Sequence, residues 1–315
     1  MGQRHTIHTL QLTHATTSLV LSDLSSAGHN VNTTTIEPDS GGPYEETSII
    51  QQIEETFDAV TPALGTLLAA LSLVQANCIE SAKTYTDLLL FGRALDPCGT
   101  DGTKSGSVHR KTTASKVRLF VTRIEAQANG PVQVTLQGAL LSADGDASPT
   151  TTVYNVALPT GGIVDEFFKF HGLKLESNTL DADKITSVSL DTGIRFQQAF
   201  GVKTYASGLI VTKTAPTLSI DTEDTSIEAT IPKTGIALTH ANTLLEFRAF
   251  DPSTGFPYAT SATEHVALTV AGKARTVQPA QGSGSSPATA RVEVKLTGIA
   301  GTPPITASTG QALTL

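Results

Sequence analysis

The stretch LLLFGRALDP (Leu88–Pro97) recurs with small changes as LLEFRAFDP (Leu244–Pro252). Each copy is an apolar segment that carries one arginine and ends in an Asp-Pro pair. The matched positions that mark this repeat are Arg93, Asp96, Pro97, Arg248, Asp251 and Pro252. They lie 155 residues apart in a chain of 315 residues. Because a duplication decides the architecture of a protein, an internal repeat is the first hypothesis to follow.

The repeat continues downstream of these markers, with a separation that rises slowly. The further matches are His109 with His265 at 156, Lys116 with Lys273 at 157, and VQVTLQG (132–138) with VEVKLTG (292–298) at 160. Upstream, IIQQIEETFDAV (49–60) is the counterpart of PTLSIDTEDTSI (216–227). Loop insertions in the second copy would produce such a drift, and the flexible run QGSGSSPATA fits one of them.

Alternation of apolar and polar residues indicates the fold class. It runs through SKVRLFVTRIEA, VQVTLQGALL and ARVEVKLTGI, which are separated by turns rich in Gly, Pro, Asp and Ser. We therefore expect a mainly β protein with two tandem barrel or sandwich domains, at residues 1–158 and 163–315. The apolar run LGTLLAALSLVQA predicts a helix over about residues 61–82, in the first domain alone.

Charge is distributed in blocks along the chain. The span between Arg4 and Lys83 contains no Lys or Arg, whereas Lys104 to Arg123 contains no Asp or Glu. Two solvated faces would explain this pattern, and so would an acidic segment that meets the basic segment of a neighbouring subunit. For the second interpretation the candidate contacts between rings are Glu45, Glu46, Glu54, Glu55, Asp58, Lys104, Arg110, Lys111 and Lys116.

Signals for catalysis, cofactors and membranes are weak. GTDGTKSG (99–106) lacks the Gly-Lys-Ser/Thr of a phosphate-binding loop, and the eight histidines are scattered. The net charge of −8 disfavours a nucleic-acid-binding protein, and Cys78 and Cys98 are too few for a disulfide framework. No apolar run is long enough to span a bilayer. We expect no enzyme activity, no cofactor, no metal site and no membrane partner.

One longer stretch carries a family resemblance. Residues 185–224, ITSVSLDTGIRFQQAFGVKTYASGLIVTKTAPTLSIDTED, resemble the first strands of the tail-tube proteins of long-tailed bacteriophages. Two long strands joined by an excursion end there in a pattern P-x-I/L-x-I-x-T-x-D. The residues that match it here are Pro216, Leu218, Ile220, Thr222 and Asp224. YEETSIIQQIEETFD (44–58) is the counterpart in the first half.

This resemblance implies a structural virion protein with two tube domains in one chain, located in the tail and assembled in the host cytoplasm. Three chains would form a pseudo-hexameric ring, and stacked rings would form a tube that conducts DNA in transit. Its partners would be copies of itself and other tail proteins. A tail hub or baseplate ring protein is the close alternative. A tandem β-sandwich binding module, either an adhesin or a capsid-decoration protein, is the alternative from another class.

Overall fold

The structure is a computed structural model. It describes residues 5–14, 17–22, 24–36, 49–71, 84–85, 87–94, 104–128, 130–161, 163–176, 178–180, 182–281, 288–298 and 303–315. The prediction of a mainly β protein is confirmed, since strands dominate and the helices are short. The sheets in this described part are open, so the barrel alternative is not observed. Below, the first half is residues 1–158 and the second half is residues 163–315.

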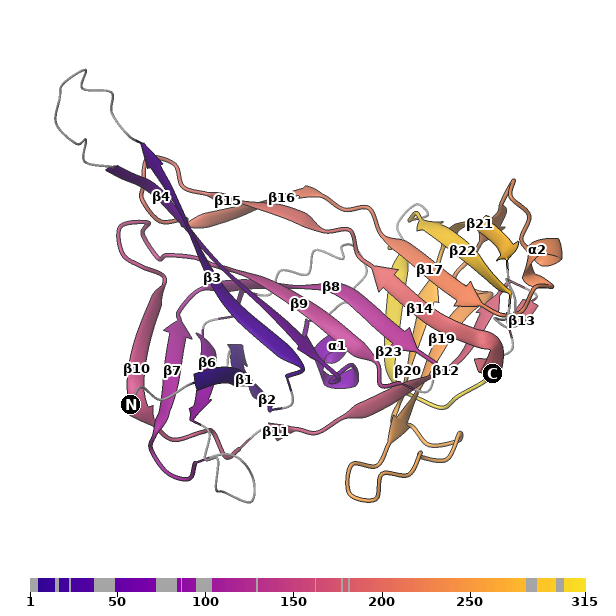
Figure 1. Ribbon diagram of the computed structural model, residues 1–315, viewed down its shortest axis with the longest axis horizontal. Coiled ribbons are helices and arrows are strands. Elements are labelled where there is room, and N and C mark those ends of the chain that lie inside the picture. Colours follow the sequence, from indigo (N-terminus) through magenta and orange to yellow (C-terminus); the bar gives the residue numbers. More distant parts are fainter. Residues whose placement is uncertain are drawn as a thin grey trace.

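Two smaller sheets have the same strand order in their respective halves (Figure 1). The first contains, in order, β10 (Thr150–Val156), β7 (His109–Ala114), β6 (Asp87–Ala94), β1 (His5–His14), β2 (Thr17–Leu21) and β11 (Ile163–Val164). The second contains β23 (Ile305–Gln311), β20 (His265–Val270), β19 (Thr243–Phe250), β12 (Phe167–Leu175) and β13 (Asn178–Leu180). Counted along the chain, β1, β2, β6, β7 and β10 correspond to β12, β13, β19, β20 and β23.

A third, larger sheet runs through both halves. Its strands are, in order, β18 (Ile236–Leu238), β21 (Gly272–Gln281), β22 (Thr289–Leu296), β17 (Thr217–Thr222), β14 (Ile185–Asp191), β8 (Val117–Gln127), β9 (Gln133–Leu140), β4 (Ile49–Thr61) and β3 (Ser26–Ile36). The short β5 (Thr84–Tyr85) also pairs with β8. Antiparallel pairing of β14 with β8 joins the halves, so one sheet crosses the expected domain boundary.

Each half carries a long hairpin that projects from this sheet. In the first half it is β3 with β4, the arm at the upper left of Figure 1. The second half bends its hairpin, so that β14 and β17 continue into β15 (Arg195–Ala199) and β16 (Gly208–Lys213). We call β15 and β16, with the turn between them, the second-half arm. It runs along the first half, above β8 and β9 in Figure 1.

The hydrophobic core is continuous across the two halves. Helix α1 (Gly65–Leu71) lies within it and buries Leu64, Leu67 and Leu68 completely. Leu and Ala are strong helix formers, which explains why this run leaves the β pattern. The helix predicted over 61–82 is thus found at 65–71; Thr61 still belongs to β4, and residues 72–83 lie outside the described ranges. The other helices are α2 (Ile227–Thr230) and the 3₁₀ turn η1 (Ala182–Lys184).

Two buried histidines occupy the same place in the two halves. The backbone N–H of Ala94 donates to Nδ1 of His109 at 2.9 Å, and that of Ala249 donates to Nδ1 of His265 at 3.0 Å. Both rings are buried, at 2% and 0% exposure. Each histidine therefore satisfies a buried backbone donor beside the repeat arginine, which is a structural role.

Irregularities of the strands recur as well. The register of β1 against β6 shifts at His8, and that of β12 against β19 shifts at His171. A second bulge occurs at Thr122 between β8 and β9, and at Val277 between β21 and β22. Bulges are specific local features, so their recurrence at corresponding places supports a common origin of the two halves.

Strand register corrects one expected alignment. Thr61 and Thr222 end β4 and β17, and each hydroxyl accepts the backbone N–H two residues further along. Thr61 lies opposite Val134, and Thr222 opposite Ala290. Strands β9 and β22 therefore correspond at a separation of 156 residues, and the match of VQVTLQG with VEVKLTG at 160 is wrong by four residues.

Candidate assembly interface

Backbone pairing between β14 and β8 forms the junction of the two halves. The register runs from Ser187 opposite Gln127 to Asp191 opposite Arg123. Arg123 adds a side-chain bond from Nε to Oγ of Ser189, at 2.9 Å. An otherwise open strand edge of each half is satisfied by the other half.

The bulge in β8 receives the residue that follows β14. The main-chain oxygen of Thr122 accepts the N–H of Thr192 at 2.9 Å and its hydroxyl at 3.1 Å. That hydroxyl also reaches the main-chain oxygen of Val121 at 3.0 Å. Thr192 is 2% exposed, so these bonds fix the register of the junction where little water competes.

The second-half arm reinforces the junction through apolar contacts. Phe196 on β15 stacks on Phe120 of β8, with ring centroids 5.2 Å apart. Next to them, Phe200 and Ala206 pack against Leu141 in a small separate cluster. Stacked aromatic pairs of this kind add stabilisation beyond the area that they bury.

Main-chain contacts then hold the tip of the second-half arm against the first half. Lys116, a predicted contact between rings, instead donates from Nζ to the main-chain oxygen of Ser207 within the same chain, at 2.7 Å. Lys203 and Asp146 form an exposed ion pair at 2.6 Å. The backbone bonds run from Ser142 N to Ala206 O at 2.7 Å, from Ile53 N to Thr204 O at 2.8 Å and from Tyr205 N to Gly145 O at 2.9 Å.

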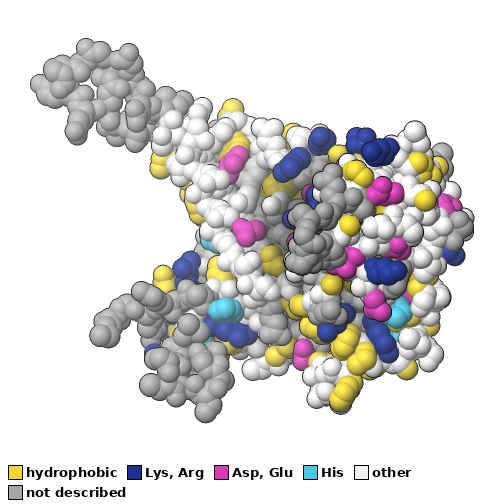
Figure 2. Space-filling model, turned by 45° about the vertical axis from the view of Figure 1, so that its right-hand side comes forward, with side chains coloured by type: hydrophobic (Ala, Val, Ile, Leu, Met, Phe, Trp, Pro, Cys, Tyr) yellow, Lys and Arg dark blue, Asp and Glu magenta, His cyan; other side chains and the backbone are white. Residues whose placement is uncertain are grey.

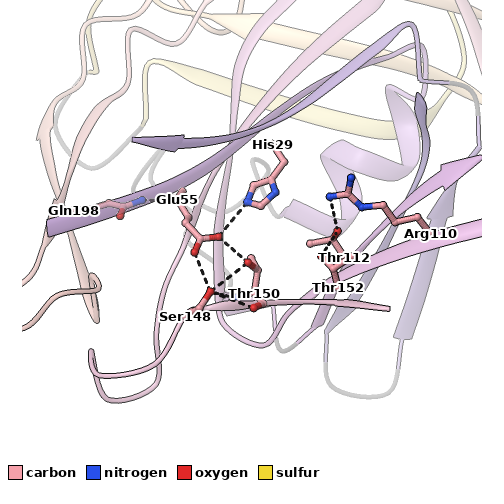
Figure 3. A network of polar contacts seen from close by, with 8 residues as sticks. All are labelled: His29, Glu55, Arg110, Thr112, Ser148, Thr150, Thr152 and Gln198. Atoms are coloured by element: carbon pink, nitrogen blue, oxygen red, sulfur yellow. Dashed lines mark hydrogen bonds and ion pairs between the residues drawn. The ribbon is translucent and has the colours of Figure 1, made fainter. Parts of the chain in front are cut away.

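A buried carboxylate lies where the arms of both halves meet (Figure 3). Glu55 on β4 accepts bonds from Oγ1 of Thr150 at 2.8 Å and Oγ of Ser148 at 3.0 Å. Nε2 of His29 on β3 lies 3.1 Å from the same carboxylate. Gln198 of the second-half arm donates from Nε2 to the main-chain oxygen of Glu55, at 2.7 Å. Glu55 was predicted as a contact between rings, but its described bonds are all inside the chain.

Hydrogen bonding sets the protonation of this carboxylate. Burial alone raises the pKa of Glu55, but the bonds from His29, Thr150 and Ser148 outweigh it and hold the pKa below its ordinary value. Glu55 is therefore charged at neutral pH. The charged form binds the arm, the loop after β9 and the edge strand β3 into one network.

The other predicted contact residues are dispersed. Asp58 accepts from Nδ2 of Asn30 at 2.9 Å, across the β3–β4 hairpin. Arg110 lines a hollow together with His29, so the acidic and basic blocks also approach each other inside one chain. Glu54 lies half-buried on β4, Lys111 half-buried on β7, and Lys104 half-buried before β7, whereas Glu45 and Glu46 lie outside the described residues. On the face drawn in Figure 2, basic and acidic side chains are interspersed.

The repeat arginines hold their surroundings by different bonds. Arg93 donates from Nε to Oγ1 of Thr9 at 3.1 Å and from Nη2 to the main-chain oxygen of Ser22 at 3.2 Å. Arg248 donates from both Nε and Nη2 to the main-chain oxygen of Tyr258, at 2.9 and 2.6 Å. The arginine is retained in both halves, but each half uses it to fasten a different loop.

The Asp-Pro turn is described in the second half only, because Asp96 and Pro97 lie outside the described residues. Asp251 accepts the hydroxyl and the N–H of Ser253 at 2.6 and 2.8 Å, and these bonds lower the pKa of its carboxyl. Pro252 lines a hollow beside α1, in which Glu166 accepts the backbone N–H of Thr66 at 3.0 Å. In the described ranges no group of three His, Cys, Asp or Glu is placed to hold a metal ion.

Three residues of the junction were not identified from the sequence. Phe120, Phe196 and Gln198 look like ordinary members of alternating strands, and only the fold brings them together. The available signal was the pair of aromatic residues on strands of different halves, which is too common to single out.

Comparison with known proteins adds no relative. No protein-family model matches the chain, and a search of curated proteins finds no significant match. Among the described residues, no helix is both long and apolar enough to cross a membrane.

Proposed function

We propose that this chain is a structural subunit that assembles with copies of itself into rings, and that the rings stack into the tail tube of a long-tailed bacteriophage. The observation that supports the proposal is the junction of β14 with β8. It joins two similar halves side by side in one sheet, as neighbouring subunits of a ring would be joined. At the ends of that sheet, β3 and most of β21 have no strand neighbour within the described residues.

Open edges explain why such a chain would assemble. An unpaired strand presents a row of N–H and C=O groups that another strand can satisfy. When the two open edges of one molecule differ, the contact is head-to-tail, and repeated head-to-tail contacts close into a ring if the rotation allows it. Three chains would place six similar halves around the axis.

The charge of the chain suits the passage of DNA. A net charge of −8 gives a wall that does not hold phosphate groups, so DNA can move through in transit without being bound. Copies of the chain and other tail proteins are then its partners, and the virion tail is its location.

Size-exclusion chromatography with light scattering, followed by negative-stain electron microscopy, tests this proposal. We expect rings of three chains with pseudo-sixfold symmetry, and stacked tubes at higher concentration. Single rings that never stack would favour a tail hub. A monomer at every concentration would contradict self-assembly and favour a tandem β-sandwich binding module.

A further inference from the structure

The junction inside the chain provides a template for a contact between chains. Strand β3 holds the position in the first half that β14 holds in the second. Ala27 lies opposite Ala59 on β4, and Val188 lies opposite Ile220 on β17. Both pairs are related by a separation of 161 residues, which is also the separation of Thr61 from Thr222.

Strand β21 likewise holds the position of β8. Their shared bulge places Thr122 at the position of Val277, a separation of 155 residues. On β8 the short β5 covers only the beginning of the outer edge, and β14 covers the rest. On β21 the short β18 covers Gly272–Ala274, and no described strand covers the rest. The open part of β21 is therefore the edge that β14 occupies in β8.

Side chains at the two open edges fit each other. In the inner junction the bulge residue Thr122 binds Thr192 through polar groups. At the corresponding open positions stand Val277, 39% exposed, and Val31, 52% exposed. Exposed β-branched apolar side chains at both edges are unfavourable in an isolated chain, and they would be buried if the two edges met.

Charges on the two surfaces are also complementary. The face of the first half that receives the second-half arm carries Phe120 and Ala139. Its counterpart in the second half carries Arg275 and Lys295, and Lys295 lies directly opposite Lys273. Like charges opposite each other are unfavourable unless an anionic partner is present. Strands β3 and β4 contain Glu54, Glu55 and Asp58, and no Lys or Arg.

We propose that the β3 edge of one chain pairs antiparallel with the β21 edge of a second copy of the same chain. Asn30 would lie opposite Gln278, as Asp191 lies opposite Arg123 inside the chain. Val31 would pack beside Val277, and the β3–β4 arm would cover the cationic face of Lys273, Arg275 and Lys295. The inference rests on the proposed self-assembly and names the surfaces that carry it.

Pro279 limits the strength of this contact. It follows Gln278 and has no backbone N–H to donate, and prolines within sheets are typical of edges and bulges. The outer contact therefore has a shorter hydrogen-bond ladder than the inner junction, and side chains carry more of its affinity. A contact of this kind can form reversibly and add one chain at a time.

Disulfide formation between chains tests the register. In a Cys78→Ser, Cys98→Ser background, Val31→Cys is combined with Val277→Cys, and equal amounts of isotope-labelled and unlabelled chains are mixed and mildly oxidised. We expect a ladder of covalent oligomers, with mixed-isotope peptides that join positions 31 and 277. The control combines Val31→Cys with Val202→Cys, because Val202 is 98% exposed on the second-half arm. Cross-linking no greater than in this control would overturn the inference.

A second variant covers the case in which the cysteine pair does not fold. Val31→Asp puts a charge at the centre of the proposed contact, so self-association measured by analytical ultracentrifugation should weaken at least about tenfold. Val202→Asp adds the same charge elsewhere and should leave association unchanged. Equal association of the two variants would also overturn the inference.

The outcomes separate this inference from the proposed function. Rings without a 31–277 link would leave the ring proposal standing and overturn the edge assignment. The 31–277 link in open chains that never close would support the edge assignment and contradict the ring.

Discussion

The two halves share one fold, but they treat equivalent positions differently. In the first half Phe57 lies opposite Gly138; at the same positions in the second half Leu218 lies opposite Val294. A large residue over no side chain and two residues of middle size fill similar volume. The halves have therefore kept the combined packing while changing the individual residues, as close-packed interiors require.

Strand edges show a similar contrast. The junction between the halves uses threonines and an aromatic stack, while the corresponding outer edges carry exposed valines and cations. The covered edge is already satisfied within the chain, whereas the outer residues would be satisfied by another chain. The comparison teaches that a duplicated fold can keep one contact internal and leave the equivalent contact for assembly.

The largest effect is expected from mixing the two packing solutions. A Cβ atom on Gly138 would lie 2.0 Å from the ring of Phe57, so Gly138→Val should destabilise the protein by more than about 3 kcal/mol. Adding Phe57→Leu reproduces the second half and should recover at least half of that loss. Urea unfolding monitored by circular dichroism measures both, and additive losses in the double variant would contradict the equivalence of these positions.

Removing either buried histidine should have the next largest effect. His109→Ala and His265→Ala each leave a buried N–H without its acceptor and create a cavity, so each should cost about 2–3 kcal/mol. The two losses should agree within about 1 kcal/mol if the residues play the same part. His171→Ala, at a half-buried bulge position, is the control, and a cost equal to that of the buried pair would count against the assignment.

A smaller, pH-dependent effect is expected at Glu55, whose position in the second half is occupied by Pro216. Its pKa is lowered in the folded protein, so its contribution is complete above the ordinary value of 4.5 and is lost as the pH falls through the lower folded value. Glu55→Gln should cost about 1–2 kcal/mol at pH 7, and the difference from the unaltered protein should shrink toward pH 3. Unfolding free energies measured at both pH values test this, and a difference that is constant with pH would contradict it.

The smallest effect concerns the cations of the outer face. Lys295→Gln removes the repulsion with Lys273 and should stabilise the isolated subunit by about 0.2–0.5 kcal/mol, while it weakens self-association. Lys233→Gln, on an exposed turn, is the matched control and should change neither quantity. Thermal unfolding at low concentration and sedimentation at high concentration separate the two effects. Lowered subunit stability in Lys295→Gln would refute the repulsion.

Alternation in the sequence was enough to predict the mainly β class and several strands. It could not fix their register, because a pattern with a period of two residues aligns equally well after any even shift. For that reason VQVTLQG was matched four residues away from its counterpart. The buried histidines were matched correctly, since a single polar residue in an apolar strand has no such ambiguity.

Long-range contacts of the candidate interface were beyond the sequence for a different reason. Gln198 binds Glu55 across 143 residues of chain, and Phe196 meets Phe120 through a bend in the second-half hairpin. Nothing in the local pattern of SLDTGIRFQQAF indicates that bend. The charge blocks did identify the region around Glu55, but the sequence does not reveal that its carboxylate points inward.

Hydrogen–deuterium exchange at low and high protein concentration tests the central claim, that the outer edges repeat the inner junction. The amides of Ser26–Val31 on β3 and of Arg275–Gln278 on β21 should exchange fast at low concentration. At high concentration they should become as slow as those of Ser187–Asp191 on β14. If both outer edges exchange at the same rate at every concentration, or if protection arises elsewhere on the surface, the claim is contradicted.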